Sequence, residues 1–422
     1  MNGRDGILLI ANNFPPVLGG SAVVYGALAR EAAPQVSVLA PRISYTDGLP
    51  LIGWREHDRA AARPRGGQPG YRVTRLALLR TPIDGPHNGG AGRLHFIARD
   101  LLIRLRIIAA VRAALRQGRI GAVCIGELVP SGWLFSVLRL WPGLRRIVYI
   151  HGEEITTRDN YDPDWSRRRR TLAAADAIIV VSRFTAGAVR MLLAEITAPP
   201  ILLPPILLIE NGVDFHRFAA SVRRADLVAH YGLEGAFVFV SVCRLLEKKG
   251  IDNAIRAFAG LWRDHPECRF LVVGAGPFAG TLQTIAIETG VADAVVFAGA
   301  VADADLADHY ALGDVFVMPN RALPSGDTEG FGLVFLEANA AGVPVIAGRD
   351  GGSVDAVTDG VNGLVVDGHA VDAIEDAMRR LYDDPQLRAD LAQRGIACAE
   401  AADWRVKARD FIAACLGRGH AA

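Results

Sequence analysis

The chain of 422 residues is poor in cysteine and lysine and has no apolar run that would span a bilayer uncharged. Its five cysteines are far apart, and no two form a C-x-x-C pair, so neither a zinc site nor a disulfide framework is expected. Four prolines interrupt its most apolar stretch, residues 196–209. The apolar start at 7–11 is too short for a signal peptide. The sequence predicts a cytoplasmic protein, soluble or peripheral on a membrane.

The composition indicates a folded protein of more than one domain. Hydrophobic residues make up 51% and charged residues 22% of the chain, which excludes intrinsic disorder. At about 150 residues per domain, the length suggests two or three domains. Residues 1–215 contain 27 arginines, no lysine and 17 acidic residues, whereas residues 216–422 contain 19 basic and 28 acidic residues. This asymmetry indicates two bodies with different partners.

Short β-branched runs alternate with helical segments along the chain, a pattern typical of parallel sheets covered by helices. Two such series follow one another and predict two doubly wound α/β domains. We expect an N-terminal domain over 1–213, a second domain over 214–396, and a last helical segment over 397–422 that crosses back to the first. Residues 46–92 are rich in Gly, Pro and Arg, and we interpret them as an irregular insertion.

Two segments have the composition of phosphate-binding turns. Gly19 and Gly20 open a helix after the first strand, where backbone N–H groups and the positive helix end favour an anion. Arg244 and Lys249 follow the strand at 237–243, and two cations beyond the carboxyl end of a parallel strand can bind a diphosphate.

The segment from Glu329 to Glu337 carries most of the functional signal. Gly330 and Gly332 form a Gly-x-Gly turn whose amides, with that of Leu333, can face a phosphate at a helix start. Glu337 lies about 7.5 Å further along that helix, a suitable offset for binding ribose hydroxyls. Glu329, in the loop before the helix, is free to meet the hydroxyls of a sugar on the other side of the phosphates.

This segment resembles the E-x7-E motif of retaining GT-B glycosyltransferases, the subgroup that includes phosphatidylinositol mannosyltransferases. Other pieces agree in order. Gly19-Gly20 resembles the family's N-terminal glycine loop, and His151-Gly152-Glu153-Glu154 its H-G-E motif. Residues 211–214 (Asn-Gly-Val-Asp) resemble its inter-domain signature, Arg244 and Lys249 its diphosphate clamp, and Gly274-Ala275-Gly276-Pro277 its G-x-G-P turn. The stretch 201–209 is longer and richer in Pro and Leu than is usual before that signature.

The resemblance implies two Rossmann-like domains that face each other across a deep cleft. It implies transfer of a hexose from a nucleoside diphosphate sugar to a lipid-linked or glycan acceptor, with retained configuration, no metal and no further cofactor. GDP-mannose is favoured slightly over a UDP-sugar. Arg244 and Lys249 would stabilise the departing diphosphate, with the amides near Gly19, Gly20, Gly332 and Leu333. By the same resemblance, the Gly274 turn contributes to the nucleotide site, Glu329 and His151 position the sugar, and Glu337 holds the ribose.

Other readings of the sequence remain open at this stage. A dinucleotide-dependent oxidoreductase lacks the expected glycine fingerprint at the first strand, and a GT-B-shaped epimerase would share the architecture. The D-x-D strings at 162–164 and 303–305 do not follow convincing strands. The basic half lacks the interleaved aromatics of nucleic-acid binding. Residues 93–119 contain seven arginines and one acid, which predicts contact with anionic lipid, although a wheel of 93–117 shows no clean polar stripe.

Overall fold

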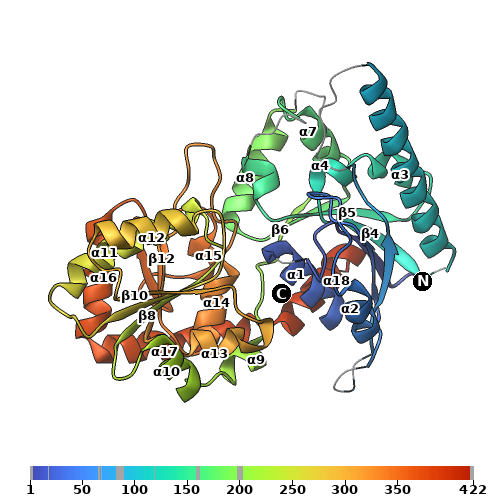
Figure 1. The fold of residues 1–422 in the computed structure, drawn as a ribbon. Coiled ribbons are helices and arrows are strands. Elements are labelled where there is room, and N and C mark those ends of the chain that lie inside the picture. The colour runs from blue at the N-terminus through green and yellow to red at the C-terminus, as the bar shows by residue number, and fades with distance from the viewer. Residues whose placement is uncertain are drawn as a thin grey trace. The chain divides into compact units, whose positions relative to one another are not determined.

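The computed structural model describes residues 3–17, 19–64, 67, 69–81, 90–117, 119–157, 162–196 and 203–418, without the side chains of 90–93. The chain divides into two compact units. Unit 1 consists of 1–181, 186–209 and 405–422, and unit 2 of 182–185 and 210–404. Each unit is a sheet with helices packed on it (Figure 1). The predicted α/β class and the two doubly wound series are confirmed.

Some predicted segments fall partly outside the described residues. These parts are Leu18 in the first glycine turn, residues 65–66, 68 and 82–89 of the segment 46–92, residues 201–202 of the stretch before Asn211, and residues 419–422 of the last segment.

Unit 1 contains a seven-stranded parallel sheet in the order β3-β2-β1-β4-β5-β6-β7. Its strands are β1 (Gly6–Ile10), β2 (Val36–Pro41), β3 (Arg72–Leu76), β4 (Ile120–Ile125), β5 (Arg145–Ile150), β6 (Ala177–Val180) and β7 (Ile206–Leu208). The central strands are buried along almost their whole length because helices cover both faces. The strand order reverses direction between β1 and β4, so their carboxyl ends border the expected ligand crevice.

The helices of unit 1 are α1 (Gly20–Glu31), α2 (Trp54–Ala61), α3 (Gly90–Arg116), α4 (Leu128–Ser131), α5 (Leu134–Leu138), α6 (Glu153–Thr156), α7 (Ser166–Ala173), α8 (Arg183–Ala194) and α18 (Trp404–Leu416). A core of aliphatic side chains joins the strands to α3, α5 and α8. Over the described residues, a search for helices able to span a bilayer gives no candidate.

The interpretation of 46–92 as an irregular insertion is wrong for its described part. That part contains α2 and the edge strand β3, which pairs in parallel with β2. The guanidinium of Arg75, on β3, is almost fully buried and binds both carboxylate oxygens of Asp58 on α2, at 3.0 and 2.8 Å. It also donates to the carbonyl of Pro41 at 2.8 Å and to that of Pro15. This side chain fastens α2 and β3 to the sheet.

Unit 2 contains a six-stranded parallel sheet in the order β10-β9-β8-β11-β12-β13. Its strands are β8 (Val238–Val242), β9 (Arg269–Val273), β10 (Val295–Gly299), β11 (Val315–Met318), β12 (Val345–Gly348) and β13 (Gly363–Val366). Its helices are α9 (Phe215–Ala219), α10 (Ala225–Tyr231), η1 (Glu247–Lys249), α11 (Ile251–Trp262), α12 (Ala279–Glu288), η2 (Asp303–Asp305), α13 (Leu306–Tyr310), α14 (Leu333–Ala340), α15 (Ser353–Ala356), α16 (Val371–Asp383) and α17 (Pro385–Ala401).

Within unit 2, the segment that follows residue 209 pairs with the segment that precedes residue 405. Val213 N donates to Ala402 O at 3.0 Å, and Trp404 N donates to Val213 O at 3.1 Å. The last helix, α18, belongs to unit 1, where Phe411 packs against Tyr149 on β5 with ring centroids 6.1 Å apart. A helix that lies far along the chain therefore packs against the sheet of unit 1.

Candidate active site

The carboxyl edge of the unit 2 sheet brings Lys249 and Glu329 together. Strand order reverses between β8 and β11, and the loops after these two strands carry the lysine and the glutamate. A reversal of this kind opens a crevice beyond the strand ends, where ligands of such sheets bind. The Lys249 ammonium contacts the Glu329 carboxylate directly, and the side chains are only 13% and 15% exposed.

The ionisation of this pair is set by two opposing effects. Burial acts to lower the pKa of Lys249, but the Glu329 carboxylate opposes it, and the resulting pKa is raised. Burial likewise acts to raise the pKa of Glu329, but the charge and hydrogen bond of Lys249 oppose it, and the resulting pKa is lowered. Both groups are therefore charged at neutral pH, so the crevice holds a preformed cation and a preformed carboxylate.

The neighbouring Lys248 fixes the loop that carries Glu329. Its buried ammonium donates to Asp327 Oδ1 at 2.7 Å and to the carbonyl of Thr328 at 3.2 Å. Gly250 then closes the turn with φ 73°, and a Cβ there would lie 2.0 Å from Pro319 O. Only glycine lets this turn approach the end of β11 so closely, and the approach sets the position of Lys249.

Arg244, the second predicted cation, is exposed. Across the described ranges, its guanidinium has no hydrogen bond or ion pair, while its positive charge acts to lower the pKa of Lys249. Arg244 and Lys249 thus differ. Lys249 is already engaged by a carboxylate, whereas Arg244 has all of its donors available for an anion.

The Gly274 turn serves close packing between two strand ends. Gly274 N donates to Gly299 O at 2.8 Å, so this amide is already used. A Cβ on Gly274 would lie 1.9 Å from Cys243 O, and one on Gly276 would lie 2.2 Å from Leu245 O. The glycines let the loop after β9 lie against the loop after β8, which carries Arg244.

Gly332 begins α14 in a left-handed conformation, with φ 89°. A Cβ at this position would meet the ring of Phe335 at 2.6 Å. The first N–H groups of a helix lack acceptors within the helix, and they carry its positive end. Leu333 is the first helical residue, so its amide is one of the groups that could face a phosphate.

Glu337 lies on α14, where sequence reasoning missed its partner. Tyr310 donates its hydroxyl hydrogen bond to Glu337 Oε2 at 2.5 Å. Burial raises the pKa of Glu337, while this hydrogen bond acts in the opposite direction. Tyr310 is itself held by the rings of Phe218 and Phe316 at 5.5 and 5.7 Å. A single tyrosine on an apolar helix face gives no sequence signal beyond core packing, so only coordinates reveal this contact.

Comparison with known proteins identifies the family of the chain. Residues 225–397 match the family model of Glycosyl transferases group 1. The chain is 35% identical to a GDP-mannose-dependent alpha-(1-6)-phosphatidylinositol monomannoside mannosyltransferase from Mycolicibacterium smegmatis, over 92% of each chain. It is 32% identical to the enzyme of that name from Mycobacterium tuberculosis, over 96% of this chain and 97% of the relative. The chain is a group 1 glycosyltransferase.

Solved structures support the same fold for this glycosyltransferase. Sucrose-phosphate synthase from Thermosynechococcus elongatus superposes with a TM-score of 0.71 at 21% identity, over 97% of both chains. Anabaena HepE in complex with UDP gives a TM-score of 0.69 at 18% identity, over 96% of this chain and 98% of HepE. The predicted GT-B architecture of two Rossmann-like domains is therefore confirmed, and so is the predicted class of enzyme, a hexosyltransferase.

In unit 1 of the glycosyltransferase, Glu127 holds the start of the glycine turn. It follows β4 and accepts hydrogen bonds from the backbone N–H of Asn12 at 2.9 Å and of Asn13 at 3.1 Å, both after β1. Burial raises the pKa of Glu127, and these hydrogen bonds oppose the shift. Gly19 caps α1 with φ 153°, and none of the described residues has an atom within 4 Å of the position that a Cβ would take there, while Gly20 is the first residue of the helix. Sequence reasoning did not find Glu127.

His151 is a neutral group in a half-buried position after β5. Burial lowers the pKa of its imidazole to about 3. The ring stacks on Tyr149 at 5.0 Å and meets the edge of Tyr25 at 5.0 Å. Its Nε2 is buried and has no hydrogen-bond partner in the part of the chain that the structure describes. A buried polar atom of this kind requires a partner, and a ligand hydroxyl would supply one.

The residues around His151 fix its backbone. Glu154 accepts hydrogen bonds from His151 N at 2.8 Å and from Gly152 N at 3.1 Å. Burial raises the pKa of Glu154 to about 7, although these bonds act to lower it. The H-G-E segment is thus closed by the following glutamate, which was not among the predicted site residues.

The two D-x-D strings have local structural roles. Asp162 accepts hydrogen bonds from Arg167 N and Arg168 N at the start of α7, at 3.0 and 2.9 Å. Asp305 pairs with Arg224 at 2.7 Å. Within the described ranges, no three His, Cys, Asp or Glu side chains gather in a metal-binding arrangement.

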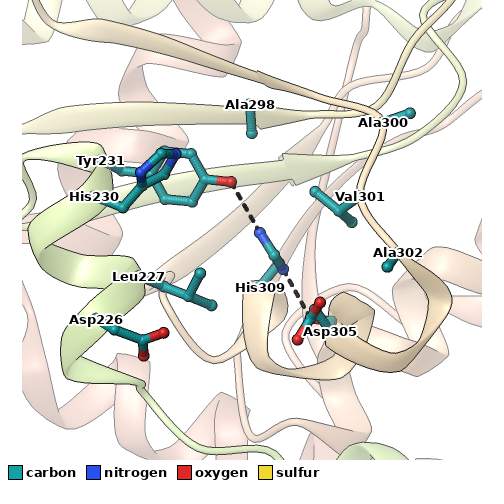
Figure 2. A pocket seen from close by; sticks show the side chains of 10 residues that line it. All are labelled: Asp226, Leu227, His230, Tyr231, Ala298, Ala300, Val301, Ala302, Asp305 and His309. Carbon is teal, nitrogen blue, oxygen red and sulfur yellow. Dashed lines mark hydrogen bonds between the residues drawn. The ribbon is translucent and has the colours of Figure 1, made fainter.

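A hollow of about 430 Å³ lies on unit 2, lined by residues of α10, β10 and α13 (Figure 2). His309 Nδ1 donates to the carbonyl of Asp305 at 2.7 Å, so Nε2 accepts from the Tyr231 hydroxyl at 3.1 Å. These polar groups satisfy one another, and none of the predicted site residues lines the hollow. We assign it no part in the reaction.

Proposed function

We propose that this glycosyltransferase transfers mannose from GDP-mannose to a phosphatidylinositol-type lipid acceptor, with retained anomeric configuration. Similarity along nearly the whole chain to two mannosyltransferases with this donor and acceptor class in their names carries the proposal. UDP-sugars are the competing donors, because HepE, which shares the fold, binds UDP.

The donor diphosphate is bound at the carboxyl edge of unit 2 by Arg244 and Lys249. Departure of the nucleoside diphosphate adds about one negative charge, and fixed cations and amides in a desolvated site stabilise such a charge strongly. The amides of Leu333 and Gly332 add the positive end of α14, and the Glu337 carboxylate accepts hydrogen bonds from the ribose hydroxyls. Because these cations and amides could together carry the charge of the departing diphosphate, we propose that the reaction needs neither a metal nor another cofactor.

The transferred sugar is oriented by one charged side chain and one neutral side chain. The Glu329 carboxylate accepts hydrogen bonds from sugar hydroxyls, and the neutral His151 uses its unpartnered Nε2 for one more. In unit 1 the amides near Gly19 and Gly20 approach the phosphates. The acceptor hydroxyl attacks the anomeric carbon as the bond to the leaving phosphate breaks, and that phosphate takes the acceptor proton. This front-face route keeps the configuration without a carboxylate nucleophile.

We further propose that unit 1 contacts the anionic cytoplasmic face of a membrane, where a lipid acceptor is found. The observation that supports this is the excess of arginine over acid in residues 1–215. Each basic residue near anionic lipid contributes about 1 kcal/mol. The run 167–170 contributes less than its composition suggests, because Arg168 is buried against Asp162.

A donor panel with a lipid extract as acceptor tests the proposal. GDP-mannose should give labelled lipid, whereas UDP-glucose and other UDP-sugars should give little. Turnover should persist in EDTA. Arg244→Ala should abolish turnover while the thermal unfolding midpoint stays near that of the wild type. Glu329→Ala should also abolish turnover, but it should lower the midpoint because it leaves the buried Lys249 ammonium without its partner. Faster turnover with a UDP-sugar would overturn the assignment of the donor, and product with inverted configuration would overturn the proposed route.

A further inference from the structure

Two tyrosine rings of unit 1 enclose His151. Its imidazole stacks on the ring of Tyr149, with centroids 5.0 Å apart and an interplanar angle of 29°, and it meets the edge of Tyr25 at 5.0 Å and 80°. The two tyrosine rings also contact each other edge to face, with centroids 5.8 Å apart. Aromatic rings attract one another in these two arrangements at separations of about 4.5–7 Å. The three rings therefore form a closed set, which we call the aromatic triangle.

The ring of Tyr25, on α1, is held in place by the end of β4. Its hydroxyl donates to Gly126 O at 2.6 Å, and a Cβ on Gly126 would lie 2.6 Å from the ring carbon that bears this hydroxyl. Gly126 N in turn donates to Ile10 O at 2.8 Å, at the end of β1. Because Tyr25 is fully buried, its ring cannot turn away from His151 without breaking a buried hydrogen bond.

The ring of Tyr149, on β5, is held by the last helix of the unit. Phe411 of α18 contacts it with ring centroids 6.1 Å apart, and both side chains are fully buried. The Tyr149 hydroxyl is buried and has no hydrogen-bond partner among the described residues. Packing of the ring therefore places Tyr149, so a phenylalanine should take the same position.

Burial decides the charge of His151 against two nearby carboxyl groups. Glu127 and Glu154 both act electrostatically on Tyr25, and each already accepts backbone N–H hydrogen bonds. Burial raises the pKa of Glu154 to about 7, so this carboxyl is mostly neutral in the acid range where a histidine ordinarily binds a proton. Tyr25 and Tyr149 stay neutral, because burial raises the pKa of each. Burial lowers the pKa of His151 to about 3.

We propose that Tyr25, Tyr149 and Phe411 are positioning residues, which fix the plane of the His151 ring and exclude water from it, so that an unprotonated Nε2 meets one hydroxyl of the transferred sugar. The unpartnered Nε2 is the observation that points to a ligand, since a buried histidine that serves packing alone ordinarily has its nitrogens satisfied. The inference rests on the proposed function, in which His151 helps to orient the sugar. It adds the last helix of the chain to the support of that site.

NMR of the full-length protein with labelled histidine tests the inference between about pH 5 and 8, and turnover is measured over the same range. The signal of His151 is the one that His151→Asn lacks. Tyr149→Leu removes the stacked ring but keeps an apolar side chain, and Tyr149→Phe keeps the ring. Tyr382→Leu is the matched control, because Tyr382 of unit 2 also contacts a histidine, His265, with ring centroids 4.2 Å apart.

The variants should separate the ring from its hydroxyl. The His151 signal should not titrate in the wild type, in Tyr149→Phe or in Tyr382→Leu. In Tyr149→Leu water reaches the imidazole, so the pKa of His151 should rise toward the ordinary value of about 6.5 and the signal should titrate. The kcat of Tyr149→Leu should fall about three- to tenfold at the alkaline end, as on loss of one neutral hydrogen bond, and further as the pH falls through the new pKa.

Phe411→Leu acts through Tyr149 and should change the titration and kcat in the same direction by less. It replaces Tyr149→Leu as the test if circular dichroism shows that the latter does not fold.

Three results would overturn the inference. They are a His151 signal that titrates near its ordinary pKa in the wild type, either an untitrated signal or an unchanged kcat in Tyr149→Leu, and a loss in Tyr149→Phe or Tyr382→Leu as large as in Tyr149→Leu. If GDP-mannose is not turned over, the NMR titration still reports on the aromatic triangle, so the two proposals fail separately.

Discussion

Replacing Lys249 by methionine should remove a cation from the site that we propose for the donor diphosphate, and it should leave the Glu329 carboxylate without its partner. Breaking a buried ion pair by removing one member costs about 3–5 kcal/mol. Because the two side chains retain 13% and 15% exposure, we expect about 3 kcal/mol, at the lower end. The measurement is urea unfolding at pH 7. Turnover should fall about 100- to 1000-fold, as on loss of one preorganised charge.

The double variant Lys249→Met/Glu329→Gln separates stability from catalysis. Removing the stranded charge should restore most of the lost free energy of unfolding, while turnover stays as low as in the single variant. If the double variant is as unstable as Lys249→Met, the ion pair is not what stabilises this loop. If Lys249→Met turns over at the wild-type rate, the lysine does not bind the diphosphate.

The pH dependence of the same comparison has a definite sign. In the wild type, the pKa of Glu329 is lowered below its ordinary 4.5, so its pairing stabilises the fold above that pH and the contribution is lost as the pH falls through the lowered value. In Lys249→Met, no ammonium opposes the effect of burial, so burial raises the pKa of Glu329. The free energy of unfolding of this variant therefore falls as the pH rises above 4.5. The difference between the two proteins should therefore be small in acid and largest near pH 7.

Three further changes test other parts of the site. The pKa of Glu154 is raised from 4.5 to about 7, so ionisation of this buried carboxyl lowers the free energy of unfolding as the pH rises through that range. Glu154→Gln should reduce this fall by up to about 1.4 kcal/mol per pH unit. Gly332→Ala should lower the free energy of unfolding by about 1–3 kcal/mol and remove most of the activity, because residue 332 has φ 89° and its Cβ would meet the ring of Phe335. Gly280→Ala on α12, where no described atom lies within 4 Å of the Cβ position, should be neutral or stabilising in the same thermal unfolding assay. Tyr310→Phe should raise KM for the donor several-fold with little change in kcat, because it removes a hydrogen bond that orients Glu337, the carboxylate that we propose binds the ribose. An unchanged KM would contradict that role.

The fold and the family were accessible from the sequence because their signals are periodic or ordered. Buried parallel strands such as β8 are continuous apolar runs, and the glycine turns fall at fixed places after them. The edge strand β3 was missed because two of its five residues are arginines and none of the five is fully buried, so it does not form a continuous apolar run. Only its pairing with β2 in the structure identifies this segment as a strand.

The missing parts of the site depend on contacts between distant residues. Sequence reasoning assigned Lys249 to a diphosphate and Glu329 to a sugar, but gave no sign that they contact each other across 80 residues of chain. Neither Glu127 nor Tyr310 belongs to a recognisable motif. Each forms hydrogen bonds with a segment that is distant in the sequence and that folding brings near. Such pairs follow from the strand order, which no local pattern specifies.

The membership of α18 in unit 1 has a consequence for synthesis on the ribosome. Arg145 Nη2 on β5 donates to the carbonyl of Ala414 at 3.4 Å, and Cys415 is fully buried in the same unit. Unit 2 is nearly contiguous in the chain and emerges complete before this last helix. Unit 1, whose translation starts first, therefore lacks α18 until residues 404–416 have been translated, and a fragment cut at residue 209 would leave the apolar surface beneath this helix uncovered.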